Sequence, residues 1–445
     1  MSSETGVNSL IKKYSTEFDY KIPRISVILA AGHGKRIKST TSKVLYEIWG
    51  VPSVMRVSES AKKGISSPNQ VIVVGIKAEE VIKALGKRKN TCFVYQKQQN
   101  GTGDAVKTAL EAINSKFGGD IYVFPADAGL ITEDVIKDFR RQFEKSHCDM
   151  MMLTGKYNGE TTQNHYGRVI KDKKTNEIIE IKEYKDVAAL DGVYKIVHKG
   201  KALSFTRDEL LKIKEFNSSI YAIKIAPLKE NIPDLKPANI QKEYYLTDMV
   251  KIFNKHSLKV GSQTVEDSEP LIGFNDRATL KKMENISRRR VYEQLKEVVT
   301  FQDPEDFFIA EEVANRILEM DKKGVLADLQ VGKGAYLGKG VILGKNVNIG
   351  KNSYLNGDIT VQEGVKIGEN VKIIGDKKYP VKIGKNANIN GISYIFGCVI
   401  NGGISIEHCI LIKKHVQKKL SRDGKIKPLR YIFPKEEGTD CLEEL

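Results

Sequence analysis

An apolar run, ISVIL at residues 25–29, leads directly into LAAGHGKR at 29–36. Small residues at the end of a strand leave successive backbone N–H groups free to converge on phosphate oxygens, because no bulky side chain keeps a ligand away. The basic residues that follow would add charge-assisted contacts to the same oxygens. The segment therefore predicts a phosphate-binding turn, and an ordinary tight turn between a strand and a loop is the alternative.

Two common phosphate-binding motifs are excluded by their spacing. GHGKR lacks the four-residue gap and the final GK[ST] of a P-loop. The pair Gly32 and Gly34 is not followed by the third glycine of a dinucleotide-binding turn. The chemistry of this turn has to be inferred from the rest of the chain.

The elements that would position the turn alternate between strand and helix patterns up to about residue 270. Short β-branched runs occupy 25–29, 70–75, 120–127, 149–155 and 218–225, and helical patterns occupy 52–63, 78–86, 103–115 and 132–144. This alternation predicts an α/β fold with a mostly parallel sheet covered on both faces. Asp127 stands at the C-terminal end of a strand run, where open sheets bind ligands, although it would also serve as a helix cap.

Beyond residue 275 the pattern changes twice. Residues 276–325 read as an arm of two helices separated by Asp303 and Pro304. Aliphatic residues then recur at a strict interval of six, at Val331, Leu337, Leu343, Ile349, Leu355, Val361, Ile367 and Ile373. This period predicts a parallel β-helix, whose stacked coils bury the aliphatic column together.

The aliphatic column resumes after an insertion at 375–380 and loses its register around 399–412. We therefore expect a β-helix of roughly four or five coils over residues 326–412. Residues 413–445 would form a charged tail that is first basic and then acidic.

The 445-residue chain has a formal net charge of +16, which favours anionic ligands. Its basic residues concentrate at 413–430 without interleaved aromatic side chains, so a solvated tail is favoured over nucleic-acid binding. The polar leader at 1–22 lacks a secretory pattern, no apolar run approaches about 18 residues, and the five cysteines include no CxxC pair. We expect a cytoplasmic protein that binds neither nucleic acid nor membrane and has no disulfide framework or zinc site.

Seven further segments follow the first turn in a fixed order. They are QNGTGDAV at 99–106, FPADAGLI at 124–131, HYGRVI at 165–170, IKEYKD at 181–186, FNSSIY at 216–221, KEYYLTDMV at 242–250 and GFNDRATL at 273–280. Together with LAAGxGxR and SKVL, this series resembles the sugar-nucleotide pyrophosphorylases. The resemblance is strongest to the uridyltransferase half of the bacterial bifunctional N-acetylglucosamine-1-phosphate uridyltransferase/glucosamine-1-phosphate acetyltransferase family, and it covers roughly residues 25–400.

The resemblance implies a Rossmann-like nucleotidyltransferase domain over 23–275, then the helical arm, then a left-handed parallel β-helix. It also implies the reaction. An oxygen of N-acetylglucosamine 1-phosphate would attack the α-phosphorus of UTP, releasing pyrophosphate and forming UDP-N-acetylglucosamine. Such a transfer requires alignment and charge neutralisation more than a covalent protein group.

Carried over residue by residue, the resemblance implies a nucleotide site. Arg36 and Lys43 would be the catalytic residues that hold the triphosphate and stabilise the departing pyrophosphate, and the alternative for Lys43 is a surface lysine. The nucleotide-binding residues would be Leu29, Ala30, Ala31, Gly32, Gln96, Gly101, Thr102, Pro125 and Ala126. Of these, Gln96 and the turn at 101–103 would contact the uracil edge and the ribose.

The resemblance also implies a metal and a sugar site. Asp127 and Asn275 would share Mg²⁺, a cation that takes one or two oxygens from the protein and the rest from phosphates and water. Gly167, Glu183 and Asn217 would bind the sugar. A polar residue after a strand is commonplace, which leaves an ordinary loop role open for these three.

Four positions depart from the family pattern. Ser42 and Gly129 replace prolines, and Ala126 and Ser219 replace glycines. The added bulk of Ala126 and Ser219 leaves the sugar open, so transfer to another sugar 1-phosphate, or from another NTP, is the alternative. A non-catalytic scaffold is a further alternative, which the retained phosphate clamp and metal pair disfavour.

The acetyltransferase part of the family pattern is missing after the arm. No segment there matches the family's histidine-containing motif, and His408 and His415 lie past the regular column. We therefore expect a β-helix that assembles a homotrimer and does not transfer acetyl groups.

Overall fold

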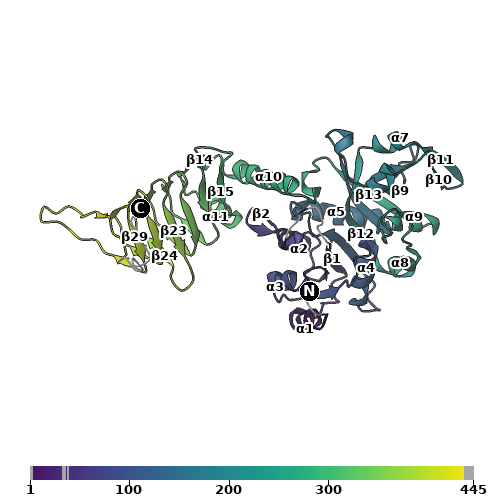
Figure 1. Cartoon of the computed structure of the whole chain (residues 1–445), viewed down its shortest axis with the longest axis horizontal. Helices are drawn as coiled ribbons and strands as arrows, with labels where there is room; N and C mark the ends of the chain where they lie inside the picture. Colours follow the sequence, from purple (N-terminus) through teal and green to yellow (C-terminus); the bar gives the residue numbers. More distant parts are fainter. Residues whose placement is uncertain (1–3, 33–36, 38–39, 435–445) are drawn as a thin grey trace, which may run out of the picture. The chain divides into compact units, whose positions relative to one another are not determined.

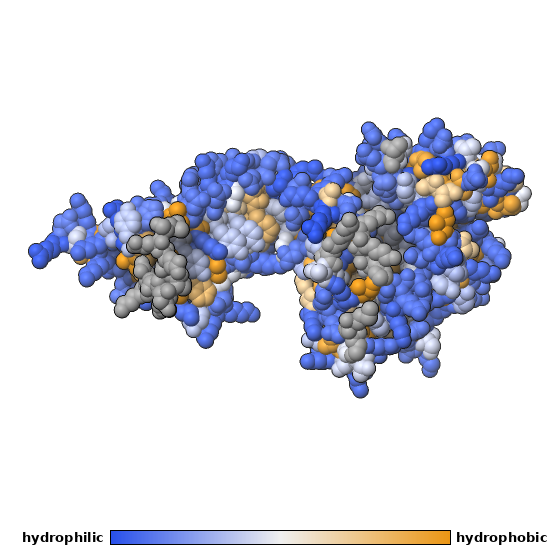
Figure 2. All heavy atoms as spheres, viewed as in Figure 1, coloured by the Kyte–Doolittle hydropathy of each residue, from blue (hydrophilic) through white to orange (hydrophobic). Residues whose placement is uncertain are grey.

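The protein, seen as a computed structural model, is described over residues 4–32, 37 and 40–434. The chain divides into two compact units, the first reaching Met283 and the second starting at Glu284 (Figure 1). Each unit buries its own apolar side chains. Much of the face shown in Figure 2 is hydrophilic, which agrees with a chain in which 29% of residues are charged. Within the described ranges, no helix is long and apolar enough to cross a membrane.

The first unit is built on one mixed sheet. Along the sheet the strands lie in the order β13 (Val260–Val265), β7 (Met150–Lys156), β12 (Glu215–Lys224), β6 (Asp120–Pro125), β1 (Arg24–Ala30), β4 (Gln70–Val74) and β5 (Thr91–Tyr95). β12 runs antiparallel to both of its neighbours, and the other pairs on this path are parallel. β8 (Arg168–Lys171) joins β12 to β9 (Ile178–Lys182). The predicted mostly parallel sheet is confirmed, with antiparallel pairs where β12 and β8 join it.

Helices cover both faces of this sheet. One face packs against α2 (Ser53–Gly64), α3 (Ala78–Leu85) and α5 (Glu133–Ser146), and the other against α4 (Thr102–Glu111), α8 (Ile225–Asn231) and α9 (Asp248–Lys255). In β1, Ile28 and Ala30 belong to the first core, whereas Ile25 and Val27 belong to the second. Successive side chains of a strand point to opposite faces, so a strand covered on both sides is apolar at nearly every position.

Shorter elements complete the first unit. They are η1 (Lys43–Leu45), β2 (Glu47–Ile48), β3 (Val51–Pro52), η2 (Thr161–Gln163), α6 (Tyr184–Ala188), β10 (Tyr194–His198), β11 (Lys201–Phe205), α7 (Arg207–Leu211), η3 (Ile232–Asp234) and η4 (Glu269–Leu271).

The polar leader is part of the first unit. Its helix α1 (Glu4–Tyr14) buries Val7 completely in the core that also contains α3. The residues after α1 pair with the edge strand β5: Thr16 N donates to Thr91 O at 2.8 Å, and Thr91 N donates to Thr16 Oγ1 at 3.0 Å. The leader thus satisfies backbone groups that an uncovered edge strand would expose.

The second unit begins within α10 (Arg277–Leu295) and continues as three parallel sheets with α11 (Glu311–Lys322) beside them. The first sheet contains β14 (Val299–Phe301), β16 (Leu329–Val331), β19 (Asn348–Ile349), β22 (Lys366–Ile367), β25 (Asn388–Asn390), β28 (Ser405–Glu407) and β31 (Leu429–Arg430). The second contains β15 (Phe307–Ile309), β17 (Ala335–Leu337), β20 (Tyr354–Gly357), β23 (Lys372–Gly375), β26 (Tyr394–Phe396) and β29 (Ile410–Ile412). The third contains β18 (Val341–Leu343), β21 (Ile359–Val361), β24 (Val381–Ile383), β27 (Val399–Ile400) and β30 (His415–Val416).

These sheets confirm the predicted parallel β-helix. All eight aliphatic residues of the six-residue repeat are buried. Leu337 pairs with Leu355, and Leu355 pairs with Ile373, so three repeats make one coil. One glycine shows how tightly the coils stack: Gly357 has φ +93°, and a Cβ on it would lie 1.8 Å from Gly375 O. Only glycine fits there.

The β-helix extends further at both ends than the sequence predicts. β14 and β15 lie inside the expected helical arm and pair with β16 and β17. Within the expected tail, β30 and β31 pair with β27 and β28. The aliphatic column also continues through 399–412 with Ile400, Ile406 and Leu411 buried. Strands of two or three residues carry no periodic signal, and the steps from Ile395 to Ile400 and from Ile406 to Leu411 are five residues long, which breaks the strict repeat.

Candidate active site

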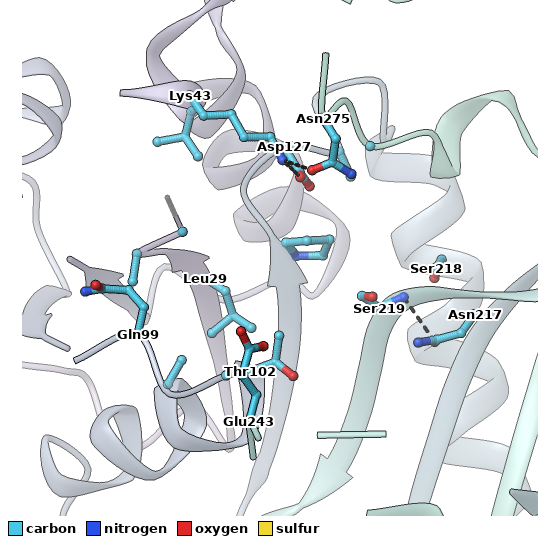
Figure 3. A pocket seen from close by; sticks show the side chains of 18 of the residues that line it. Leu29, Lys43, Gln99, Thr102, Asp127, Asn217, Ser218, Ser219, Glu243 and Asn275 are labelled. Atoms are coloured by element: carbon cyan, nitrogen blue, oxygen red, sulfur yellow. Dashed lines mark hydrogen bonds and ion pairs between the residues drawn. The ribbon is translucent and has the colours of Figure 1, made fainter. Parts of the chain in front are cut away.

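A cavity of about 530 Å³ lies at the C-terminal ends of strands β6, β1 and β5 of the first unit (Figure 3). Leu29 of β1, Gln96 just after β5 and Pro125 at the end of β6 all line it. Open α/β sheets bind ligands at this edge, so the topology places the cavity where a substrate is expected.

Most of the site residues expected from the sequence meet in this cavity. Those that line it are Leu29, Ala31, Gly32, Lys43, Gln96, Gly101, Thr102, Pro125, Asp127, Asn217 and Asn275. Ala30, Ala126, Gly167 and Glu183 are not part of its lining. Arg36 lies outside the described residues. The roles of all these residues stay predictions.

One charge interaction in the cavity joins Lys43, Asp127 and Asn275. Lys43 Nζ donates to Asp127 Oδ2 and, at 2.6 Å, to Asn275 Oδ1 (Figure 3). The side chain of Lys43 is only 10% exposed, and its Nζ lies 5.5 Å from the ring centroid of Phe274. A Cβ on Gly273 would lie 3.0 Å from Asp127 Oδ1, so the glycine leaves room for the carboxylate. One cation therefore holds together three segments distant in sequence.

The oxygens of Asp127 and Asn275 fit a divalent cation. Both contact the same ammonium nitrogen, so they already converge on one positive centre. In the described part of the chain, no three His, Cys, Asp or Glu side chains form a metal-binding group. Two protein oxygens suit Mg²⁺, which takes its remaining ligands from phosphates and water. A metal at these oxygens would have to replace the Lys43 ammonium.

Two of the sequence motifs form one wall of the cavity. Gly103 N donates to Tyr244 O at 2.7 Å, and Leu246 N donates to Thr102 Oγ1 at 3.0 Å. Gly101 has φ +114°, and a Cβ on it would lie 2.5 Å from Tyr244 O. The turn at 101–103 requires glycine because the chain of the EYYLTD motif passes directly against it.

The three expected sugar residues are neighbours, although only Asn217 lines the cavity. Asn217 N donates to Gly167 O at 2.9 Å, and a Cβ on Gly167 would lie 3.1 Å from Glu183 Oε1. Asn217 is 3% exposed, and its Nδ2 donates to Tyr221 Oη at 2.7 Å. Gly167 and Glu183 therefore lie behind Asn217, which forms part of the cavity wall.

Ser219 departs from the family pattern within the cavity wall itself. It lines the cavity, and the register between β12 and β7 shifts beside it. Its φ is +62°, in the left-handed region that glycine adopts without strain. Ser219 N donates to Asn217 Oδ1 at 3.0 Å, which stabilises the bulge. The other glycine replacement, Ala126, is 1% exposed and is not part of the lining.

Several lining residues were not singled out by the sequence analysis, among them Tyr166 and Lys185. Tyr166 stacks on Phe216 with ring centroids 4.4 Å apart, and burial together with the nearby charge of Asp127 raises its pKa to about 12. Tyr166 therefore keeps its proton near neutral pH. Lys185 Nζ donates to Gln241 Oε1 across the cavity rim. Both residues lie in motifs quoted above, but a motif does not reveal which side chain faces a cavity.

Comparison with known proteins agrees with this geometry. Residues 26–212 match the family model described as the MobA-like NTP transferase domain. The chain is 36% identical over 293 residues to the bifunctional protein GlmU of Acetivibrio thermocellus, and 34% identical over 290 residues to that of Caldanaerobacter subterraneus subsp. tengcongensis. Each alignment covers 65% of this chain and 57% of the relative, so the matched part spans little more than half the length of these relatives.

Among solved structures, a UDP-glucose pyrophosphorylase complexed with UDP-glucose is similar at 16% identity, with a TM-score of 0.43, over 60% of this chain and 99% of that one. The similarity to the relatives named bifunctional protein GlmU confirms the resemblance that the sequence analysis describes. The match to the NTP transferase model covers less than half of this chain.

Glu183 should make the stability of the first unit depend on pH. Burial, together with the charges of Asp186 and Asp248, raises the pKa of this carboxyl from 4.5 to about 7. Between these values the folded state binds more protons than the unfolded state, so stability falls as the pH rises. Glu183→Gln removes this contribution. Its melting temperature relative to the parent protein should therefore increase from about pH 5 to about pH 8.

The exposed Glu111 is the matched control, and Glu111→Gln should show no such trend. A difference between Glu183→Gln and the parent that stays constant with pH would contradict the assignment.

Proposed function

We propose that this NTP transferase domain transfers UMP from UTP to N-acetylglucosamine 1-phosphate in a Mg²⁺-dependent reaction that releases pyrophosphate. The observation that carries the proposal is the meeting of Lys43, Asp127 and Asn275 in one cavity at the C-terminal edge of the sheet. The relatives named bifunctional protein GlmU support the same assignment.

The residues of the cavity would act through alignment and charge. The sugar phosphate oxygen forms a bond to the α-phosphorus, and the bond from that phosphorus to the leaving pyrophosphate breaks. Bound at Asp127 and Asn275, Mg²⁺ would neutralise phosphate charge. Lys43 then gives up these two oxygens, and its ammonium becomes available to phosphate oxygens. Preorganised positive charge of this kind stabilises the charge that develops on the leaving group.

A second candidate is transfer to another sugar 1-phosphate or from another NTP. Ser219 favours this alternative because its side chain stands in the cavity wall where the family pattern has glycine. Ala126 gives it less support because its methyl group is buried outside the cavity. The identity of the sugar therefore depends mainly on the wall formed by residues 217–219.

A panel assay of pyrophosphate release tests the proposal directly. Several NTPs are combined with several sugar 1-phosphates in the presence of Mg²⁺. We expect the highest kcat/KM for UTP with N-acetylglucosamine 1-phosphate. A higher value for another pair would establish the second candidate, and no release with any pair would refute both.

Two substitutions should separate charge stabilisation from metal binding. Lys43→Ala should lower kcat roughly 10²-fold, on the scale of one lost preorganised electrostatic contact, and should not raise the Mg²⁺ concentration required, because the ammonium no longer competes for the two oxygens. Asp127→Asn should shift activity to higher Mg²⁺ concentrations, since it removes the full negative charge of the pair. Glu79→Gln, which alters a carboxylate paired with Lys83 on the surface, is the control and should leave the Mg²⁺ titration unchanged.

The metal role of Asp127 would be wrong if both carboxylate variants gave the same titration. The assignment of Lys43 would be wrong if a folded Lys43→Ala protein turned over normally.

We further propose that the β-helix assembles a homotrimer and transfers no acetyl group. Phe308, Tyr336 and Tyr354 form a stack on consecutive strands of the second sheet, with ring centroids 4.4 and 4.6 Å apart. Such a ladder supplies apolar surface that a cyclic assembly could bury. His408 stacks on Tyr431 and His415 contacts Asn401, so both histidines have local structural partners.

The full-length protein should sediment as a trimer, and Tyr336→Asp with Tyr354→Asp should shift it toward monomers with the transferase activity retained. A cut near Lys323 is unsuitable, since β14 and β15 would lose their partners. CoA release above background with acetyl-CoA and glucosamine 1-phosphate would overturn the single-activity proposal. A monomeric parent protein would overturn the assembly role.

A further inference from the structure

The cavity wall after β5 contains a carboxamide whose donors are already occupied. Gln96 is 4% exposed, and its backbone N donates to Val74 O at 2.8 Å. Its side-chain Nε2 donates to Gly101 O at 3.2 Å and to Asp104 Oδ2 at 2.8 Å. A carboxamide nitrogen has two hydrogens, so these two hydrogen bonds use its donor capacity.

The chemistry of these partners fixes which way the carboxamide points. A carbonyl oxygen and a carboxylate oxygen only accept hydrogen bonds. Rotating the amide by half a turn would place Gln96 Oε1 against two acceptors, which repel it. Among the described residues, Gln96 Oε1 has no hydrogen-bond donor. Because Gln96 lines the cavity, this oxygen is the polar group that its side chain offers to a ligand.

We propose that Asp104 is a specificity-determining positioning residue, which holds the Gln96 amide so that the cavity presents a hydrogen-bond acceptor to the nucleobase. The inference rests on the proposed function for the nucleotide and deepens it. Uracil carries an N3–H donor between two carbonyl groups, whereas N3 of cytosine is an acceptor. Gln96 Oε1 would attract the first and repel the second.

Asp104 acts through Gln96 and not through the ligand. It lies in the first turn of α4, is half-buried, and does not line the cavity. If the Asp104 carboxylate were removed, Gly101 O would be the remaining acceptor that orients the Gln96 amide. The amide could then rotate and offer Nε2 to a base acceptor, which weakens discrimination against cytosine.

The test measures kcat/KM for UTP and for CTP with N-acetylglucosamine 1-phosphate, and the binding of each nucleotide alone by calorimetry. Asp104→Ala should lower the UTP-to-CTP ratio on the order of tenfold, the value of one neutral hydrogen bond. Asp104→Asn should restore most of the ratio, because its Oδ1 still accepts from Gln96 Nε2. Glu111→Ala removes a carboxylate from the same helix and should leave the ratio unchanged.

An unchanged UTP-to-CTP ratio in a folded Asp104→Ala protein would overturn the inference. So would an Asp104→Asn protein whose ratio is as low as that of Asp104→Ala. Gln96→Met provides a second test if Asp104→Ala does not fold. Methionine has a similar length but no strong hydrogen-bond acceptor, so the UTP preference should be lost. Retention of that preference would also overturn the inference.

UTP methylated at N3 lacks the proposed donor and should bind the parent protein as poorly as CTP does. Tight binding of this analogue would contradict the acceptor role of Gln96. The binding ratios also separate two kinds of failure. Absence of turnover with every nucleotide would refute the proposed function, whereas the calorimetric UTP-to-CTP ratio would still decide the role of Asp104.

Discussion

The first unit depends on one half-buried charge interaction, the ammonium of Lys43 held between Asp127 and Asn275. Lys43 follows the first turn, Asp127 follows β6, and Asn275 precedes α10, so the contact links the beginning, the middle and the end of the domain. A lysine side chain that is 10% exposed needs such partners, because an unpaired charge there would be strongly unfavourable. The same requirement has two sides. If the Lys43 ammonium moves away from Asp127 and Asn275, another cation has to contact their oxygens, and the ammonium itself then needs another anion.

Much of the fold could be predicted from sequence because its strands and coils have strong periodic signals. β1, β4, β6 and β7 are apolar runs, and the aliphatic residues from Val331 to Ile373 recur every six positions. β14, β15, β30 and β31 could not be predicted in the same way. Each has two or three residues, and its stability comes from pairing with a coil distant in sequence rather than from a local pattern.

For the site, the sequence predicted which segments meet but not how their side chains are oriented. Eleven of the expected residues line one cavity, because motif positions at strand ends are brought together by the sheet. The burial of Ala126, the φ of Ser219 and the contact between Gln96 and Asp104 could not be read from the sequence. Each depends on which way a side chain points in the folded chain, and single residue types do not determine this direction.

The pairing of the leader with β5 has a consequence for biosynthesis. Thr16 and its partner Thr91 are 75 positions apart, so the leader is made long before the strand it covers. At a synthesis rate of about 5–20 residues per second, α1 waits roughly 4–15 seconds for β5. During that time α1, whose Val7 is later in the core, lacks β5, one of the elements that it contacts in the folded unit. Chain elongation therefore sets a period in which α1 exists without the strand that it later covers.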